Sequence, residues 1–214
     1  MNRITSSTIE YKITLGDHSN MEEFINQWSK VYKYSLEEKY DNNISTGLES
    51  EIKLLELFLW KNGTGDNVSS NKMKTINGFI LQMNILRELQ QSFNWNTFER
   101  EFEPQKNSSI WKIFLLHIID PQVFPIFDQH VFRAFTFITE GTITELPQNK
   151  GGIKHKEVYA IYKETYLPWF SQIRDNQNIK PKRIDEALFS FGRVLKSLRN
   201  VPAKISKAAI IASI

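Results

Sequence analysis

Apolar residues recur every three or four positions along most of this chain, a spacing that places them on one face of a helix. Only residues 10–15 alternate as a short edge strand does, and residues 147–152 are expected to hold a small turn or hairpin. The pattern predicts an all-α fold with at most one short N-terminal strand. The expected helices cover residues 17–34, 48–60, 70–93, 95–102, 110–119, 128–138, 155–173, 181–198 and 201–214.

Glycine and proline set several of the expected helix ends. Gly63 suits the left-handed turn past the end of a helix, and Pro121 disfavours helix at the residue before it. Pro168 is expected to kink or split the helix that contains it, whereas Pro181 suits the first turn of a helix. The polar residues 41–46 predict a loop.

The length of 214 residues predicts one compact domain over residues 1–214. We expect two helical lobes within it, of approximately residues 1–104 and 105–214. Hydrophobic residues make up 41% of the chain and aromatic residues 13%, so large side chains should fill a sizeable core.

Composition excludes several classes of site. The absence of cysteine rules out disulfides, cysteine-ligated zinc and iron–sulfur clusters. No HExxH spacing occurs among the four histidines, so neither a metal nor any other cofactor is expected. No apolar run approaches the roughly 18 residues that span a bilayer, and residues 1–20 lack a signal-peptide core. We therefore expect a cytoplasmic protein without a membrane partner, and the sequence does not set its oligomeric state.

Charge is unevenly distributed although the net charge is only +3. Residues 180–207 hold eight basic and two acidic side chains, a net charge of +6. Residues 36–57 hold six acidic side chains and two lysines, a net charge of −4. The C-terminal part could therefore present a basic face to a nucleic acid, although an ordinary solvated surface explains the same pattern.

The most informative segment is residues 124–135, FPIFDQHVFRAF. An apolar run opened by a proline leads to Asp128, and the amphipathic helix that follows places Asp128 at or beside its N-cap. This segment resembles part of the helix-hairpin-helix DNA glycosylases, which include endonuclease III, the adenine glycosylases and the 8-oxoguanine glycosylases. The resemblance covers residues 108–135 well and the other helices loosely. It implies a two-lobed, all-α fold in which Asp128 is catalytic.

A catalytic aspartate at this place has a clear physical purpose. Breaking an N-glycosidic bond builds positive charge on the sugar, and a rigidly held carboxylate can stabilise that charge or activate the attacking group. The resemblance also implies that the flipped-out base lies in a pocket between the lobes. The alternative role for Asp128 is a plain N-cap, which stabilises a helix by about 1 kcal/mol.

Two features of the family are altered here. Its hairpin turn contains glycines and grips a DNA phosphate, whereas residues 104–109 contain none, so the hairpin is expected to be degenerate. The place of the family's Schiff-base lysine falls near Ile110, and Lys112 lies about 200° around a helix from that place. A monofunctional, water-using glycosylase is therefore the expected form of an active enzyme.

Six further residues are candidates for contacts with DNA or with an extruded base. Lysine and arginine side chains would hold phosphates, a tryptophan at a helix end would stack on a base, and a histidine one turn from the arginine would face the same cleft. These candidates are Trp60, Lys61, Lys106, Lys112, His130 and Arg133.

Structural roles compete with several of these functional ones. Trp60 is equally suited to anchoring the core, Arg133 to an ion pair, and His130 to a partly buried hydrogen bond. His117, on an apolar helix, is expected to be a satisfied core histidine. Asp185 and Glu186 are expected only to favour the start of their helix.

The sequence therefore predicts a DNA-binding, glycosylase-like protein that excises a damaged or modified base with Asp128. The first alternative is a catalytically silent helical module of the same fold that binds DNA or a protein. The second is an unrelated all-α interaction protein in which the resemblance is a coincidence. A positively charged cleft around Asp128 would favour the glycosylase or the silent module. A neutral, filled cleft would favour the unrelated interaction protein.

Overall fold

The computed structural model of the chain describes residues 18–63, 65, 67–102 and 109–198. Helices make up most of these residues, and the only sheet among them is one two-stranded hairpin, so the prediction of an all-α fold is confirmed. Each helix in the described part is too short or too polar to cross a bilayer. The strand predicted at residues 10–15 and the helix predicted at residues 201–214 lie outside the described residues.

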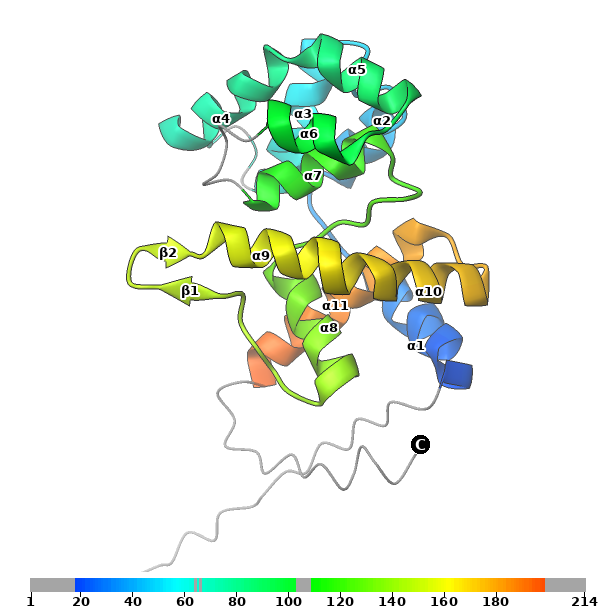
Figure 1. Cartoon of the computed structure of the whole chain (residues 1–214). Helices are drawn as coiled ribbons and strands as arrows, with labels where there is room; N and C mark the ends of the chain where they lie inside the picture. Colours follow the sequence, from blue (N-terminus) through cyan, green and yellow to red (C-terminus); the bar gives the residue numbers. More distant parts are fainter. Residues whose placement is uncertain (1–17, 64, 66, 103–108, 199–214) are drawn as a thin grey trace, which may run out of the picture.

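The helices form two groups, which lie one above the other in Figure 1. The upper group consists of α2 (Glu37–Asn43), α3 (Glu51–Asn62), α4 (Ser70–Ile80), α5 (Met83–Gln91), α6 (Trp95–Glu101) and α7 (Ser109–Ile119). The lower group consists of α1 (His18–Lys30), α8 (Gln129–Glu140), α9 (His155–Ile161), α10 (Leu167–Gln177) and α11 (Pro181–Leu198). A π-helical segment, η2 (Tyr162–Tyr166), joins α9 to α10, and the hairpin β1 (Gln148–Asn149) and β2 (Gly152–Ile153) precedes α9.

The first described helix, α1, packs against the last, α11, in the lower group. The rings of Phe24 and Trp28 on α1 lie 5.2 and 5.0 Å from the ring of Phe191 on α11. The chain therefore passes between the two groups twice, through residues 31–36 and through residues 120–128. A division into lobes near residue 104 remains a prediction.

Large aromatic side chains fill the upper core. Phe58 on α3 is fully buried, and its ring lies 5.4, 5.3 and 5.5 Å from the rings of Phe79, Trp111 and Phe114. Aromatic pairs at such separations add to the hydrophobic contribution of burial. This packing positions the C-terminal end of α3 at the boundary between the two groups.

Several predicted helix ends are confirmed. Gly63 follows α3 with a φ of 72°, the left-handed conformation expected past a helix end. The helix predicted at residues 181–198 matches α11 at both ends. Pro168 lies in the first turn of α10, and the chain before it widens into η2 because a proline offers no N–H to the helical hydrogen-bond ladder.

Two expectations about helices are wrong. Residues 41–43 of the predicted loop at 41–46 belong to α2. This helix is polar, follows Leu36 at a φ of 72° and buries only Tyr40 and Asn43. The predicted single helix at residues 70–93 is interrupted at Leu81, which is 87% exposed. The break turns α5 so that its apolar face, like that of α4, reaches the upper core.

His117 is a core histidine with both ring nitrogens satisfied, as predicted. Its Nδ1 lies 2.7 Å from the carbonyl oxygen of Phe124, and its Nε2 lies 2.7 Å from the hydroxyl of Tyr40. The Nδ1–H therefore donates to the carbonyl, and Nε2 accepts from the tyrosine. Burial is the main cause that lowers the pKa of His117, to about 3.

This lowered pKa predicts an acid-dependent loss of stability. Below about pH 6.5 the unfolded chain binds a proton that buried His117 does not, so its contribution to stability falls from there towards its folded pKa of about 3. Between about pH 7 and about pH 5, the free energy of unfolding should fall less in His117→Asn than in the wild type. The difference between the two slopes should be up to about 1.4 kcal/mol per pH unit. Urea denaturation of both proteins measures this, and equal pH dependences would contradict the assignment.

Candidate functional site

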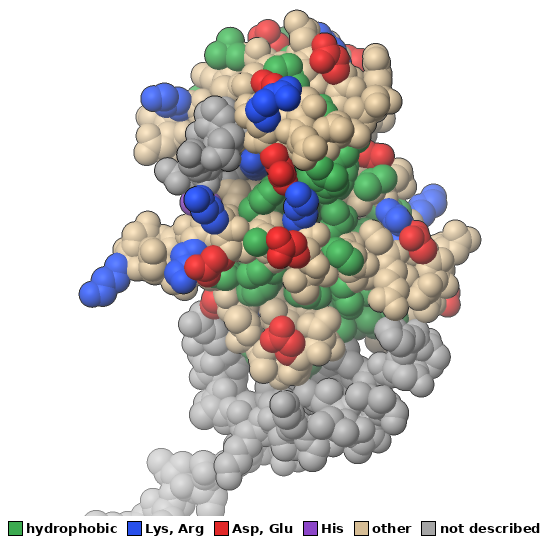
Figure 2. All heavy atoms as spheres, viewed as in Figure 1, with side chains coloured by type: hydrophobic (Ala, Val, Ile, Leu, Met, Phe, Trp, Pro, Cys, Tyr) green, Lys and Arg blue, Asp and Glu red, His purple; other side chains and the backbone are tan. Residues whose placement is uncertain are grey.

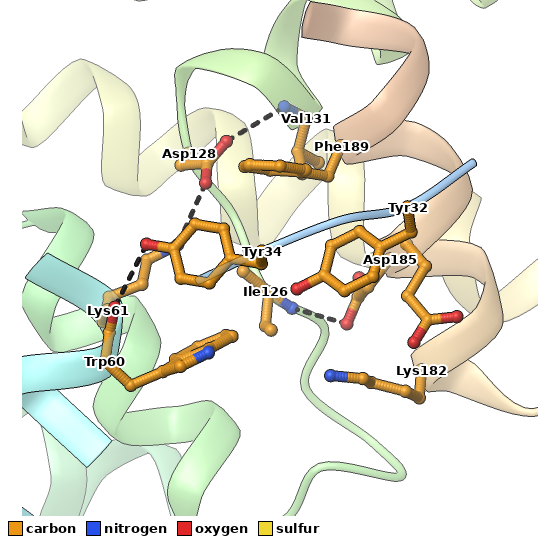
Figure 3. A pocket seen from close by; sticks show the side chains of 11 residues that line it. Tyr32, Tyr34, Trp60, Lys61, Ile126, Asp128, Val131, Lys182, Asp185 and Phe189 are labelled. Atoms are coloured by element: carbon orange, nitrogen blue, oxygen red, sulfur yellow. Dashed lines mark hydrogen bonds and ion pairs between the residues drawn. The ribbon is translucent and has the colours of Figure 1, made fainter. Parts of the chain in front are cut away.

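A small cavity lies between the two groups of helices, at the place where both connecting segments cross (Figure 3). The cavity offers about 30 Å³ to the centres of water-sized molecules, which is room for one or two waters and not for a nucleobase. Four separate segments supply its walls. They contribute Tyr32, Tyr34, Trp60, Lys61, Ile126, Asp128, Val131, Lys182, Asp185, Glu186 and Phe189.

Asp128 is the N-cap of α8, as the sequence predicts. Its Oδ1 accepts hydrogen bonds from the backbone N–H groups of His130 and Val131, at 2.8 and 3.1 Å. Its Oδ2 lies 3.1 Å from the amine of Lys61, which comes from the C-terminal end of α3. Figure 3 shows the carboxylate between Val131 and Lys61 at the edge of the cavity. Asp128 therefore caps its helix with one oxygen and joins the two groups with the other.

Asp128 is ionised at neutral pH. Burial raises its pKa, but the positive charge of Lys61, the side chain of His130 and the hydrogen bond from Val131 together outweigh burial, so the pKa lies below its ordinary value. The side chain of Asp128 remains 20% exposed, whereas that of Lys61 is 8% exposed. The site thus holds a rigid, partly accessible carboxylate in its charged form.

Trp60 is both a core anchor and a wall of the cavity. It is almost fully buried, its indole N–H donates to Glu37 at 3.2 Å, and its carbonyl accepts from the hydroxyl of Tyr34 at 3.1 Å. The ring of Tyr34 lies 5.3 Å from that of Trp60 and 5.6 Å from that of Phe189, in edge-to-face geometry. These rings give the cavity apolar walls beside Asp128.

Lys182 fills the opposite side of the cavity. Its amine lies 3.8 Å from the ring centroid of Tyr40, 5.5 Å from that of Tyr32 and 5.6 Å from that of Trp60, and it pairs with the carboxylate of Glu37. Figure 3 shows the lysine reaching from α11 across the cavity towards the indole. We call these three rings with Glu37 the aromatic box.

Asp185 has a larger role than the start of a helix, which corrects the expectation from the sequence. Its side chain is 4% exposed, and its Oδ2 accepts a hydrogen bond from the backbone N–H of Ile126 at 3.1 Å. Its Oδ1 is buried without a hydrogen-bond partner among the described residues. Burial is the main cause that raises the pKa of Asp185 well above its ordinary value, so the folded protein favours the neutral acid.

Replacing Asp185 with asparagine should stabilise the protein increasingly as pH rises. The folded-state pKa lies above the unfolded one, so the contribution of the aspartate is complete below about pH 4 and is lost at higher pH. Asparagine keeps the acceptor for Ile126 and carries no charge. The free energy of unfolding of Asp185→Asn, relative to that of the wild type, should rise by up to about 1.4 kcal/mol per pH unit. Urea denaturation at about pH 5 and about pH 8 measures this difference. A difference that does not change with pH would contradict this.

The structure brings some of the predicted DNA-contacting residues to the cavity and not others. Trp60 and Lys61 line it, and His130 lies beside it, with its ring 5.1 Å from that of Phe189. Arg133, 4% exposed, forms two hydrogen bonds with Glu145, at 2.7 and 2.9 Å, and contacts His130.

Of the remaining two lysine candidates, Lys112 lies away from the cavity. Lys112 is 8% exposed, and its amine lies 4.9 Å from the ring centroid of Tyr159. To reach a phosphate, Lys112 would have to leave this ring. Arg133 would likewise have to leave Glu145. Lys106 lies outside the described residues.

Several residues of the cavity went unrecognised in the sequence. Tyr32 and Tyr34 follow α1 and show only as alternating aromatic positions. Phe189 shows only as a member of an amphipathic helix, and Lys182 only as one of the basic residues of the segment 180–207. Nothing in their spacing links them to Asp128. Their common feature is a place near one of the two crossings of the chain.

Comparison with protein-family models, with curated proteins and with solved structures finds no match to this chain. Among the described residues, no three histidine, aspartate or glutamate side chains lie close enough together to hold a metal ion. The function must therefore be argued from Asp128, Lys61 and the walls of the cavity.

Proposed function

We propose that the chain is a DNA-binding, glycosylase-like protein that releases a damaged or modified base with Asp128 as its catalytic carboxylate. One observation carries the proposal. A charged carboxylate is fixed by two backbone amides at a helix N-terminus, and it borders an aromatic cavity between two groups of helices. The resemblance of residues 108–135 to helix-hairpin-helix DNA glycosylases adds to it.

The chemistry of Asp128 follows from its charge and its rigidity. When the bond between the sugar C1′ and the base nitrogen breaks, the electron pair leaves with the base and positive charge develops on the sugar. The carboxylate of Asp128 stabilises that charge, because it is already oriented and ionised. A water then adds to C1′ and its proton balances the electron pair on the departed base, which leaves an abasic site and the free base. Lys61 keeps Asp128 ionised and in place.

The aromatic walls supply the second requirement, a place for the base. Trp60, Tyr34 and Phe189 present rings on which a planar base could stack. The cavity of about 30 Å³ must widen to admit one. Both ion pairs at the cavity, Lys61 with Asp128 and Lys182 with Glu37, connect the upper group to the lower one, so widening would separate or loosen them.

The charge distribution of the protein predicts only weak binding to DNA. On the face shown in Figure 2, basic and acidic side chains are interspersed rather than segregated. The cavity itself has two lysines against three acidic residues. With a net charge of only +3 we expect modest, salt-sensitive affinity for duplex DNA. Fluorescence binding at two salt concentrations measures it, and an absence of binding at the lower one would remove the nucleic acid from the proposal.

A catalytically silent module of the same fold is the second candidate. Two observations favour it over the enzyme, and they equally favour the unrelated all-α interaction protein: the cavity is small, and both oxygens of Asp128 already have partners. In that case Asp128 and Lys61 only join the two groups of helices, and the protein binds DNA or another protein without breaking a bond.

Base release from a panel of duplexes separates the two candidates. The panel carries oxidised, deaminated, alkylated and mismatched bases, and abasic sites are revealed by strand cleavage in alkali. The proposal expects release from at least one duplex by the wild type and loss of that release in Asp128→Asn. No release from any duplex by a folded protein would favour the silent module.

A further inference from the structure

We propose that the cavity takes a planar heterocycle bearing a positive charge, and that Lys182 occupies the place of this charge in the free protein. In the setting of the proposed function, on which this inference rests, the heterocycle is an N-alkylated nucleobase. Three features of the cavity carry the inference: the aromatic box, two acidic groups without an ion pair, and the path by which Lys182 can leave.

The aromatic box is a receptor for a cation. The faces of aromatic rings are negatively polarised, and a cation within about 6 Å of a ring centroid is attracted to it. The amine of Lys182 meets this condition for Tyr40, Tyr32 and Trp60 at once, at 3.8, 5.5 and 5.6 Å. Glu37 completes the box and is fixed by hydrogen bonds from Tyr32, at 2.8 Å, and Trp60, at 3.2 Å. The box is therefore built around a positive charge and is filled by the protein's own lysine.

Two acidic groups of the cavity remain without a salt bridge. Lys61 is paired with Asp128 and Lys182 with Glu37, whereas neither Asp185 nor Glu186 forms an ion pair with another described residue. Asp185 is the stronger sign of a ligand, because its Oδ1 is buried in the wall of the cavity without a hydrogen-bond partner among the described residues. A ligand with an N–H group would satisfy that oxygen, and its positive charge would favour the ionised form of Asp185 over the neutral acid of the free protein.

The side chain of Lys182 can leave the aromatic box. Its side chain is 28% exposed, so its flexible stem can swing towards solvent while α11 stays in place. Its departure would uncover ring faces of Trp60 and Tyr32 and leave Glu37 without its cation. A charged heterocycle replaces both the ring contacts and the charge, whereas a neutral one replaces only the contacts. The cavity should therefore select for charge as well as for shape.

The test compares two nucleosides of the same outline with the full chain by calorimetry. N7-methylguanosine carries a positive charge at mildly acidic pH, and 7-deaza-7-methylguanosine does not. We expect the charged nucleoside to bind about tenfold more tightly, the factor that a desolvated cation–π contact of about 1–2 kcal/mol supplies. Lys182→Met, which keeps the length of the side chain and removes its charge, should bind the charged nucleoside more tightly than wild type does, because no internal cation competes. Lys180→Met, an exposed lysine two residues away, is the matched control and should bind like wild type.

Two results would overturn the inference. The first is equal affinity for the two nucleosides, or binding of neither. The second is weaker binding of the charged nucleoside by Lys182→Met, because Lys182 would then contact the ligand rather than compete with it. Each variant must first unfold cooperatively, so that a loss of binding is not a loss of fold.

Duplexes distinguish this inference from the proposed function. Duplexes with N7-methylguanine, 8-oxoguanine and uracil are incubated with the protein, and Asp128→Asn measures spontaneous loss of the methylated base. Release of a neutral base in preference to N7-methylguanine would keep the proposed function and overturn the inference. Selective binding of the charged nucleoside with no release from any duplex would keep the cation site and overturn the glycosylase.

Discussion

The Asp128→Asn protein is expected to release its base at least about a hundredfold more slowly than the wild type, and to be less stable because Lys61 is left buried without its carboxylate partner. Asparagine and aspartate are about equally good N-caps, so the hydrogen bonds from His130 and Val131 survive the change. The negative charge is lost, and removal of one preorganised electrostatic contact from a transition state typically slows a reaction about 10²–10³-fold. Single-turnover base release, with the unfolding midpoint measured in parallel, tests both parts.

Asp128→Ala provides the control for this prediction. Alanine removes the cap as well as the charge, so we expect its free energy of unfolding to be about 1 kcal/mol below that of the asparagine variant. If Asp128 were only a cap and the partner of Lys61, asparagine would lower stability through the lost ion pair but would leave the rate of base release unchanged. Equal rates of base release in wild type and Asp128→Asn would therefore contradict the catalytic assignment.

Gly192→Val is expected to lower the free energy of unfolding by about 3 kcal/mol or more. Gly192 lies where α11 crosses α8, and a Cβ atom there would come within 1.9 Å of the carbonyl oxygen of His130. That oxygen belongs to the backbone and cannot turn aside, so the two helices must move apart. Separation would also displace His130 and Asp128 on α8, and activity should fall with stability. Urea denaturation measures the first effect and base release the second.

A matched control for Gly192 is available in the hairpin. A Cβ atom at Gly151 would meet only the side-chain oxygen of Asn149, at 3.3 Å, and that side chain can move. Gly151→Val should therefore change the free energy of unfolding by less than about 1 kcal/mol. Similar losses in both variants would show that valine itself, rather than the helix crossing, is responsible.

The helices were predictable where local signals agree with the tertiary packing. Pro181 marks the start of α11, Gly63 the end of α3 and Asp128 the cap of α8, since each satisfies a local backbone requirement. The interruption at Leu81 was not predictable, because the apolar spacing continues through it and the nearest glycine, Gly78, lies inside α4. Similarly, α2 has few apolar residues and depends on contacts with α3.

The candidate site was predictable only in part, for a similar reason. Asp128 could be found because its signal lies within a dozen consecutive residues. Its partner Lys61 is 67 positions away, and the aromatic box joins residues 32–60 to Lys182. Such pairings depend on how the two groups of helices meet, which no local pattern encodes. The buried oxygen of Asp185, which has no hydrogen-bond partner within the described part of the chain, is likewise a property of the packing, although its residue belongs to an ordinary helix start in sequence.

The measurement that tests the central claim most directly is the affinity of the protein for duplexes that carry a pyrrolidine in place of one nucleotide. Pyrrolidine is positively charged at the position of the sugar and so imitates the charge that develops in base release, and tetrahydrofuran is its neutral counterpart. Because an enzyme binds the transition state more tightly than the ground state, we expect wild type to prefer the pyrrolidine duplex by about a hundredfold or more. Asp128→Asn should lose that preference while it keeps its affinity for the neutral duplex. Equal affinity of the wild type for both duplexes would contradict the claim that Asp128 stabilises a developing positive charge.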